Sequence, residues 1–370
     1  MIMLDSLFYT FIAVVLVQGF FYIFFFGRFA FATQKKESQK NIAVSVIICA
    51  KNEAENLKTF IPLILNQEYP LFEIVLINDA SHDNTLEVME TFAFKSDRVK
   101  VVNVENNEAF WGNKKYALTL GIKASKYDFL LLTDADCKPT SKHWIKEMSS
   151  HFSNTKTIVL GYGAYSKIKH SILNKLIRFE TLLTAIQYFS FAKVGLPYMG
   201  VGRNLAYRKD TFYKANGFMN HMNIRSGDDD LFINQVATAK NTSIIFSKDS
   251  FTSSLPKTTF RSWFKQKKRH VTTAKHYKFI HKTLLALFYV SQFLFWLLAI
   301  ILFAGLFKWK IVLILFLIKI TIQFIVFAYS AKKLDEQGII VLLPFLEVFL
   351  ILAQLTIFIS NLISKPNHWR

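Results

Sequence analysis

The sequence is poor in cysteine and in negative charge, and both shortages limit what the protein can be. Its 370 residues include two cysteines, Cys49 and Cys137, without the spacing of a metal site. Both lie in or beside apolar, strand-like runs, so we expect reduced, buried thiols of a cytosolic domain. Only 26 Asp and Glu oppose 45 Lys and Arg, a formal net charge of +19. No nucleic-acid recognition motif accompanies this charge, which favours anionic membrane lipids and a phosphorylated substrate as partners over nucleic acid.

Charge is also scarce in four long apolar runs, as expected of a membrane protein. Residues 7–26 carry none and are long enough to cross a hydrocarbon core of ~30 Å. They lack the basic start and the cleavage site of a signal peptide, so they predict an anchor. Three further spans are predicted at 284–307, 311–330 and 339–363.

The cations that follow the first span predict the orientation. Arg28, Lys35, Lys36 and Lys40 place the next segment in the cytoplasm by the positive-inside rule. With three more spans the C-terminal end would lie outside, although the outer joint at 308–310 carries two lysines. We therefore expect a multi-pass protein of the inner (plasma) membrane with a cytoplasmic catalytic domain.

Two ionisable residues, Lys319 and Glu347, lie inside predicted spans, where such groups are expensive and usually paired. Counted from the inner ends of their spans, their depths differ by roughly 5 Å. We expect them to pair with each other. The pair can be a structural tie, or it can bind a lipid head or help to translocate a product.

The region between the spans alternates short apolar runs with helical segments. The runs are 42–50, 72–79, 99–104 and 127–134, and a helical stretch covers 113–125. This pattern predicts βαβ units on a mostly parallel sheet that is buried on both faces, an α/β fold. Ligands bind such a sheet at the carboxyl ends of its strands.

Polar residues cluster at three of these strand ends: Asn52 and Glu53, Asn78 and Asp79, Asp134 and Asp136. Residues i and i+2 of an extended chain point the same way, so Asp134 and Asp136 can face one site. Two hard oxygen donors suit Mg²⁺ or Mn²⁺ bound to substrate phosphates. An aspartate-rich turn is the alternative for this fragment taken alone.

Seven motifs in this order resemble the membrane-bound family 2 glycosyltransferases, which include cellulose, hyaluronan and chitin synthases and, more loosely, ceramide glucosyltransferases. They are SVIICAKNEAENL, EIVLINDASHDNT, GNKKYAL, LLTDADC, GVGRNLAYRK, GDDDLF and QKKRH. The resemblance covers residues 42–272 and implies a GT-A-type, Rossmann-like nucleotide-sugar domain. The domains would be an anchor at 1–30, a catalytic domain at 42–254, a basic interfacial segment at 255–282 and three helices at 283–363.

The resemblance implies roles for individual residues. Ala50, Glu53 and Asp79 would line the base and ribose of the nucleotide, and Lys114 would lie near the diphosphate. Asp134 and Asp136 would be the aspartate-any-aspartate element, with Asp136 the more direct ligand of Mg²⁺ or Mn²⁺. Asn78 departs from the more usual aspartate.

Two further motifs concern the sugar and the acceptor. In the resembling enzymes the region of Arg203 and Asn204 lies near the acceptor and the donor sugar; a plain turn before a strand is the alternative. Gln266, Arg269 and His270 match the catalytic Gln-x-x-Arg-Trp element, except that His270 replaces tryptophan. That replacement puts acceptor stacking, and with it the synthesis of long polymers, in doubt.

Three consecutive aspartates in GDDDLF are assigned different roles. Acids before an apolar run also suit the start of a helix. Laid on the family pattern, Asp228 becomes the catalytic base, and Asp229 falls at the free position and caps the helix. Asp230 becomes the second acid, which holds the loop or a basic neighbour.

Two surface segments complete the interpretation. Residues 255–282 carry nine Lys or Arg and no acid, as expected of a helix along anionic headgroups. Residues 169–196 are apolar but interrupted by charges, which predicts an amphipathic helix on the membrane or over the acceptor entrance.

The sequence thus predicts an inverting glycosyltransferase that uses a nucleotide diphosphate sugar, with UDP as the favoured nucleotide, and a lipid or glycan acceptor at the cytoplasmic face. A processive polysaccharide synthase is the alternative within the family. A nucleotide-binding scaffold or transporter without activity is the alternative from another class.

Overall fold

A computed structural model describes residues 2–34, 41–105, 114–224 and 226–363. Lys35, Lys36 and Lys40, three of the four cations used to orient the first span, lie outside this part, as does the tail after residue 363.

The core of the soluble region is a sheet whose first four strands run parallel: β1 (Val44–Ala50), β2 (Phe72–Asp79), β3 (Val99–Val104) and β4 (Phe129–Asp134). These are the four predicted runs. Alternate side chains of β1 and β2 enter two separate apolar cores. One core includes α5 (Lys114–Ala124), and the other includes α3 (Ala54–Leu65) and α4 (Thr85–Lys95). Burial on both faces explains why these strands are continuously apolar.

Three shorter strands extend the sheet: β8 (Leu205–Arg208), β6 (Ile158–Leu160) and β9 (Thr242–Ile244). Within the described residues the order is β3-β2-β1-β4-β8-β6-β9, and β8 is antiparallel to both neighbours. The sheet is therefore mixed and mostly parallel, as predicted. The chain moves from β1 to β2 on one side and to β4 on the other, so the switch point lies between β1 and β4.

A second, small sheet adjoins the carboxyl end of β4. It consists of β5 (Cys137–Pro139), β10 (Thr252–Ser254) and β7 (Gly163–Tyr165). Short helices connect the strands around both sheets: α6 (Trp144–Ser150), α8 (Lys209–Lys214) and α9 (Asp230–Val236).

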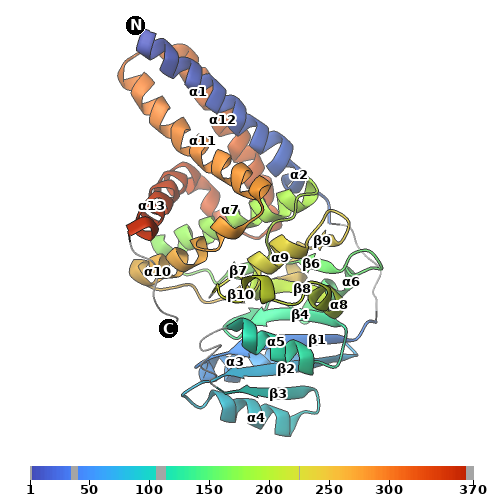
Figure 1. Cartoon of the computed structure of the whole chain (residues 1–370). Helices are drawn as coiled ribbons and strands as arrows, with labels where there is room; N and C mark the ends of the chain where they lie inside the picture. Colours follow the sequence, from blue (N-terminus) through green and yellow to red (C-terminus); the bar gives the residue numbers. More distant parts are fainter. Residues whose placement is uncertain (1, 35–40, 106–113, 225, 364–370) are drawn as a thin grey trace.

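Among the described residues, four helices are long and apolar enough to cross a membrane, one near the N-terminus and three near the C-terminus. The first, Ile2–Ala30, comprises α1 (Ile2–Phe20), a π-helical turn and α2 (Gly27–Ala30). The others are α11 (Phe279–Ala304), α12 (Trp309–Lys333) and, after a 3-10 helix at Gln337–Leu342, α13 (Leu343–Ile363). Figure 1 shows α1, α11 and α12 as one bundle above the soluble region.

Lys308, in the turn between α11 and α12, pairs with Asp5 at 2.8 Å. This contact explains how a cation is accommodated in this turn. It also shows that this turn and the start of α1 lie at the same end of the bundle.

The predicted pairing of Lys319 with Glu347 is confirmed, at 3.4 Å between Nζ and Oε1. Both side chains are fully buried. Gln292, Trp296 and Gln323 also donate hydrogen bonds to the Glu347 carboxylate. A charge in an apolar layer is stable only with such partners.

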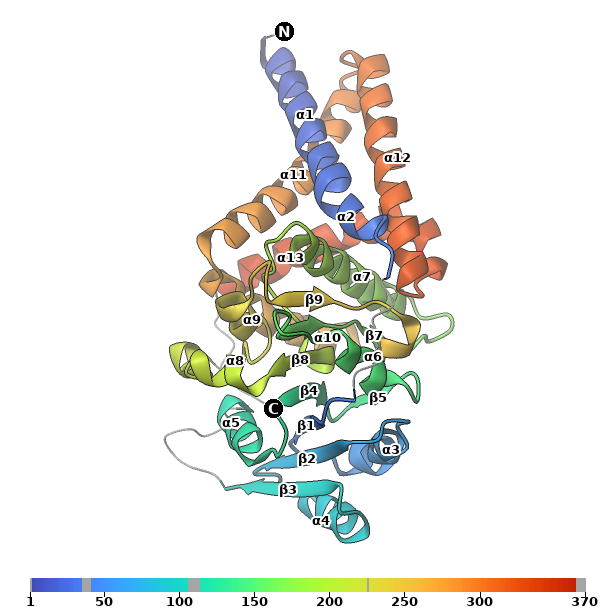
Figure 2. The same cartoon turned by 90° about the vertical axis from the view of Figure 1, so that its right-hand side faces the viewer.

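Two helices lie between the bundle and the sheets, α7 (Ile172–Lys193) and α10 (Phe260–Val271) (Figures 1 and 2). α7 covers most of the predicted amphipathic helix but is buried over much of its length, against α2, the π-helical turn and α13. α10 carries much of the basic segment and is largely accessible to solvent.

Candidate active site

The polar strand ends meet at the switch point, as predicted. In the register of the sheet, Cys49 of β1 lies opposite Asp134 of β4, and Ala50 opposite Asn78 of β2. A cleft opens there, and it is lined among others by Cys49, Lys114, Asp134, Gly202, Asp228 and Asp229. The cleft thus joins five motifs that are far apart in the sequence.

Lys114 connects the two acidic motifs. Its Nζ lies 2.8 Å from Asp134 Oδ1 and 3.1 Å from Asp228 Oδ2. Burial alone would lower the pKa of Lys114. The negative charges of Asp134 and Asp228 together have a larger effect in the opposite direction, so the pKa of Lys114 is raised. Burial likewise opposes the charge on Asp228, and Lys114 overcomes it and lowers the pKa of that carboxyl. Lys114 and Asp228 are therefore both charged at neutral pH.

Asp134, Asp136 and Cys137 form a candidate metal site, with ligand atoms all within 4.8 Å of one another. The Cys137 thiol donates to Asp136 Oδ1 at 3.3 Å, and burial raises its pKa, so it stays protonated. Burial and the charge of Asp134 raise the pKa of Asp136. Two carboxylates that repel each other at such a short distance fit a hard divalent cation such as Mg²⁺ or Mn²⁺.

The three aspartates have different surroundings. Asp229 is the N-cap of α9, as predicted: its Oδ1 accepts from the backbone N–H of Asp230 at 2.7 Å. Its Oδ2 accepts from the N–H of Gly202, also at 2.7 Å, and so joins the GDDD and GVGRN motifs. A Cβ on Gly202 would come within 3.3 Å of that oxygen, which explains a glycine at this position.

Asp230 holds the loop, one of the two roles predicted for it. Its Oδ2 accepts hydrogen bonds from the hydroxyls of Thr273 and Tyr277, and its Oδ1 accepts from the N–H of Leu231. These hydroxyls come from the segment after α10. Asp230 therefore fixes the basic segment to the loop that carries Asp228.

Arg203 and Asn204 lie on opposite sides of the turn before β8. The Arg203 guanidinium stacks on Tyr165 and donates to Ala164 O and Ser254 Oγ, next to the candidate metal site. Its charge also lowers the pKa of Asp136, after the larger effects named above. Asn204 is fully buried: its Nδ2 donates to the carbonyls of Tyr162 and Ser250, and its Oδ1 accepts from Trp144 Nε1. The structure thus brings Arg203 to the site and places Asn204 behind it as a support for the turn.

The Gln-x-x-Arg-His motif, with Gln266, Arg269 and His270, lies on α10. Burial lowers the pKa of Arg269, and the negative charges of Asp228, Asp134 and Asp229 partly offset this by raising it. It therefore lies near the acidic cluster. Gln266 occupies the preceding turn of the same helix, and His270 follows Arg269.

The residues predicted to line the nucleotide, Ala50, Glu53 and Asp79, lie at or just after the ends of β1 and β2. Ala50 is buried, and burial raises the pKa of Glu53 and of Asp79. The charges of Asp136 and Asp134 also raise the pKa of Glu53, which places it on the metal side of the cleft. Asn78 donates to Asn103 Oδ1 at 2.8 Å, so the departure from aspartate serves a strand-to-strand contact.

Sequence reasoning missed Lys115, which is buried and donates to the carbonyls of His221 at 2.7 Å and Ile224 at 2.9 Å. Burial lowers its pKa to about 8. Lys115 thus holds the chain that leads into GDDD. The sequence signal for this role was the pair of lysines in GNKKYAL. Neighbouring residues of a helix face different ways, so only one of the two lysines can face the acidic motifs directly.

Two family descriptions match the chain. Residues 45–214 match glycosyl transferase family 2, and residues 134–355, more than half of the chain, match glycosyl transferase family group 2.

Curated relatives carry related names. The chain is 34% identical over 134 residues to the poly-beta-1,6-N-acetyl-D-glucosamine synthase of Staphylococcus epidermidis, covering 35% of this chain and 31% of the relative. It is 29% identical over 151 residues to the 4,4'-diaponeurosporenoate glycosyltransferase of Staphylococcus haemolyticus, covering 40% and 39%. The matches thus span about a third of the length of these relatives.

A solved structure has the same fold over nearly the whole chain. It is a mannosyltransferase from Pyrobaculum calidifontis, in complex with GDP-Man and Mn²⁺. The TM-score is 0.62 over 98% of this chain and 99% of that one, at 16% identity. The similarity includes the helical part as well as the sheets.

Proposed function

The chain belongs to glycosyl transferase family group 2 and is a glycosyltransferase, and from this premise we propose the reaction that it performs. It transfers a sugar from a nucleotide diphosphate sugar, a UDP-sugar in the first instance, to a hydroxyl of a lipid or glycan acceptor. Transfer inverts the anomeric carbon and takes place at the cytoplasmic face of the plasma membrane.

The observation that carries the proposal is the position of Lys114 between Asp134 and Asp228. One ammonium thus links the metal-side acid to the acid that the motif assigns as base. Because Lys114 keeps Asp228 ionised, that carboxylate is ready to accept a proton from an acceptor hydroxyl. A donor diphosphate would offer Lys114 a competing anion, which would release Asp228 for this task.

Asp134 and Asp136 would hold Mg²⁺ or Mn²⁺, which neutralises charge on the departing diphosphate. Lys114 and Arg269 supply further positive charge on the same side. Asp228 accepts the proton of the hydroxyl as the oxygen attacks the anomeric carbon. Glu53 and Asp79, at the ends of their strands, would bind the base and ribose, with Ala50 against the base. Gln266 and His270 would face the acceptor.

The acceptor decides between a single transfer and a polymer. The glucosamine polymer synthase of Staphylococcus epidermidis is one relative, which keeps a polysaccharide product as a second candidate. His270 in place of tryptophan and the small number of apolar helices favour a lipid-linked or short product.

The test is a panel of UDP-sugars, with GDP-mannose added, incubated with Mn²⁺ and purified protein in native lipid. We expect release of a nucleotide diphosphate and one sugar-bearing product by mass spectrometry. No turnover with any donor, in lipid and glycan extracts that carry acceptors for a known transferase, would reject the proposal. A ladder of products would show that the enzyme polymerises the sugar instead of transferring a single one.

A further inference from the structure

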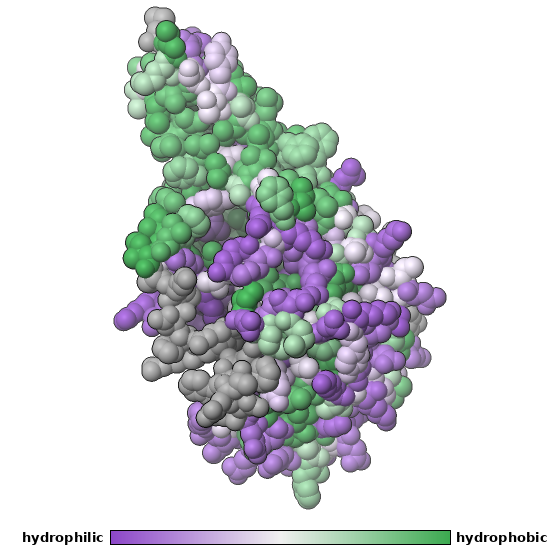
Figure 3. Space-filling model, in the orientation of Figure 1, coloured by the Kyte–Doolittle hydropathy of each residue, from purple (hydrophilic) through white to green (hydrophobic). Residues whose placement is uncertain are grey.

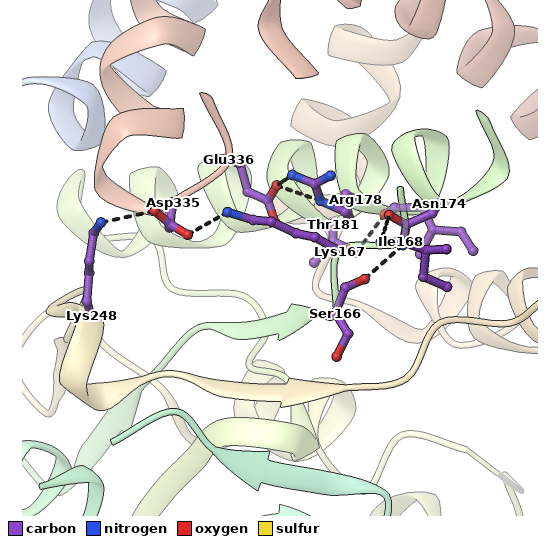
Figure 4. A network of polar contacts seen from close by, with 10 residues as sticks. Ser166, Lys167, Ile168, Asn174, Arg178, Thr181, Lys248, Asp335 and Glu336 are labelled. Atoms are coloured by element: carbon purple, nitrogen blue, oxygen red, sulfur yellow. Dashed lines mark hydrogen bonds and ion pairs between the residues drawn. The ribbon is translucent and has the colours of Figure 1, made fainter. Parts of the chain in front are cut away.

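The segment after α12 starts against the soluble domain. Asp335 lies 3.0 Å from Lys248 and also pairs with Lys167, while Glu336 is buried against Arg178 (Figure 4). Lys248 precedes β10 and Lys167 follows β7, so both flank the small sheet beside the candidate metal site. These contacts fix the start of the segment to the same side of the membrane as the catalytic domain.

The same segment also ends against this domain. Lys268 of α10 donates from Nζ to Ser360 Oγ at 2.9 Å, and its carbonyl oxygen accepts from Asn361 Nδ2 at 3.1 Å. Phe260 packs edge-on against Phe349 of α13. α10 carries Arg269 and four further cations in twelve residues, so it cannot lie within the hydrocarbon layer.

A helix of this length that crossed the membrane could not make both sets of contacts. The 21 residues of α13 measure about 32 Å, close to the ~30 Å of a hydrocarbon core. If α13 crossed, Ser360 would lie near the opposite surface from Glu336. Figures 1 and 2 show α13 crosswise to the bundle of α1, α11 and α12, over α7 and α10.

The two faces of α13 show what surrounds it. Leu346, Leu350 and Ile357 face the protein, whereas Phe345 is 76% and Leu362 is 73% exposed. Further apolar side chains continue the exposed face: Phe349, Leu352, Phe358 and Ile359. The space-filling view shows hydrophobic surface on the bundle and again beside it, with hydrophilic residues gathered below (Figure 3). Such a face is stable against lipid and not against water.

We propose that residues 337–363 form a re-entrant segment, which enters and leaves the bilayer on the side of the catalytic domain and rests its exposed apolar face on lipid. Glu347, paired with Lys319 of α12, lies near its deepest point. Only α1, α11 and α12 then cross. The end of α13 then lies on the side of the catalytic domain, and the sequence that follows it includes Lys365 and Arg370, as the positive-inside rule favours for that side. The inference does not depend on the proposed reaction.

Epitope accessibility tests the topology in intact cells and inside-out vesicles. One epitope follows Arg370, a second is inserted in the exposed loop 153–155 of the soluble domain, and a third in the turn 305–308. We expect the first two to be accessible in the same preparation and the third in the other. An epitope after Arg370 that behaves like the one at 305–308 would overturn the proposal.

Crosslinking tests the contact itself. Lys268→Cys with Ser360→Cys should form a crosslink with a short bifunctional maleimide in native membranes, because the two side chains are in contact. Lys268→Cys with Leu313→Cys, on the distal part of α12, is the matched control and should not. Each single-cysteine variant, treated in the same way, reveals any crosslink that arises from the native Cys49 or Cys137. Equal crosslinking in both pairs, or none in either, would contradict the re-entrant path.

Discussion

Asp228 and Asp229 are adjacent aspartates, both largely shielded from bulk solvent, yet we expect opposite results when each is replaced by asparagine. Asp228→Asn removes the group that accepts the proton, and positioned general bases contribute about 10²–10⁴-fold to rate. We expect kcat to fall at least about a hundred-fold. The affinity for the nucleotide should change by no more than about threefold, because the groups assigned to the base and ribose lie on β1 and β2.

Asp229→Asn should leave most of the activity. Burial, together with the charges of Asp228 and Asp230, raises the pKa of Asp229 to about 8, so its carboxyl is neutral at pH 7. Asparagine has the same shape and no charge. It keeps one of the two accepted hydrogen bonds, to Gly202 or to Asp230, and loses the other at a cost of about 1 kcal/mol in stability.

The raised pKa of Asp229 also predicts a pH dependence of stability. An unfolded aspartate titrates near 3.9, so between about pH 4 and pH 8 the folded protein holds a proton that the unfolded chain releases. Asp229 therefore makes the free energy of unfolding fall as pH rises through this window. In Asp229→Asn the unfolding temperature should fall less between pH 5 and pH 8 than in the unmodified protein.

The assay is nucleotide release under saturating donor, with donor binding measured separately by calorimetry. A loss of more than a hundred-fold in both variants would show that the base is misplaced. Normal turnover in Asp228→Asn would refute the mechanism.

Three other changes test separate parts of the account. Asp136→Asn removes one of the two proposed carboxylate ligands, so the Mn²⁺ concentration needed for half-maximal donor binding should rise at least about tenfold. Unchanged Mn²⁺ binding, measured by electron paramagnetic resonance, would place the metal elsewhere. Lys319→Met should destabilise the protein by about 3–5 kcal/mol, because it leaves Glu347 buried without its cation. The double variant Lys319→Met with Glu347→Leu should recover much of this stability in thermal unfolding. No recovery would mean that the two residues are not coupled. Tyr277→Phe removes one hydrogen bond to Asp230 and should lower kcat several-fold at unchanged donor affinity. A loss of donor affinity alone would show that this contact does not position the base.

The sheet was predictable where its strands are buried on both faces. Continuous apolar runs such as 72–79 became β2 with the same bounds, because burial on both faces leaves no room for alternation. β6 and β9 have three residues each, too few to show a period, and pairing in the folded sheet defines them.

The site was predictable where a motif assigns a role, and less so where a side chain bonds to another motif. The capping role of Asp229 follows from its place before an apolar run. Its bond to Gly202 joins segments 27 residues apart and has no local signal. Lys115 was missed because lysine is usually exposed, and only the fold shows that two carbonyls surround its ammonium.

The apolar helices show the same limit. The length and composition of α13 satisfy every criterion for a span, and only contacts at both of its ends indicate a different path. Hydropathy measures the preference of a segment for lipid. It does not reveal how the segment lies in lipid.

The anomeric configuration of the first product tests the central claim most directly. Nuclear magnetic resonance of the product formed from an α-linked nucleotide sugar should show a β-linkage, because Asp228 deprotonates the acceptor for a single displacement at the face opposite the diphosphate. An α-linked product would contradict this account.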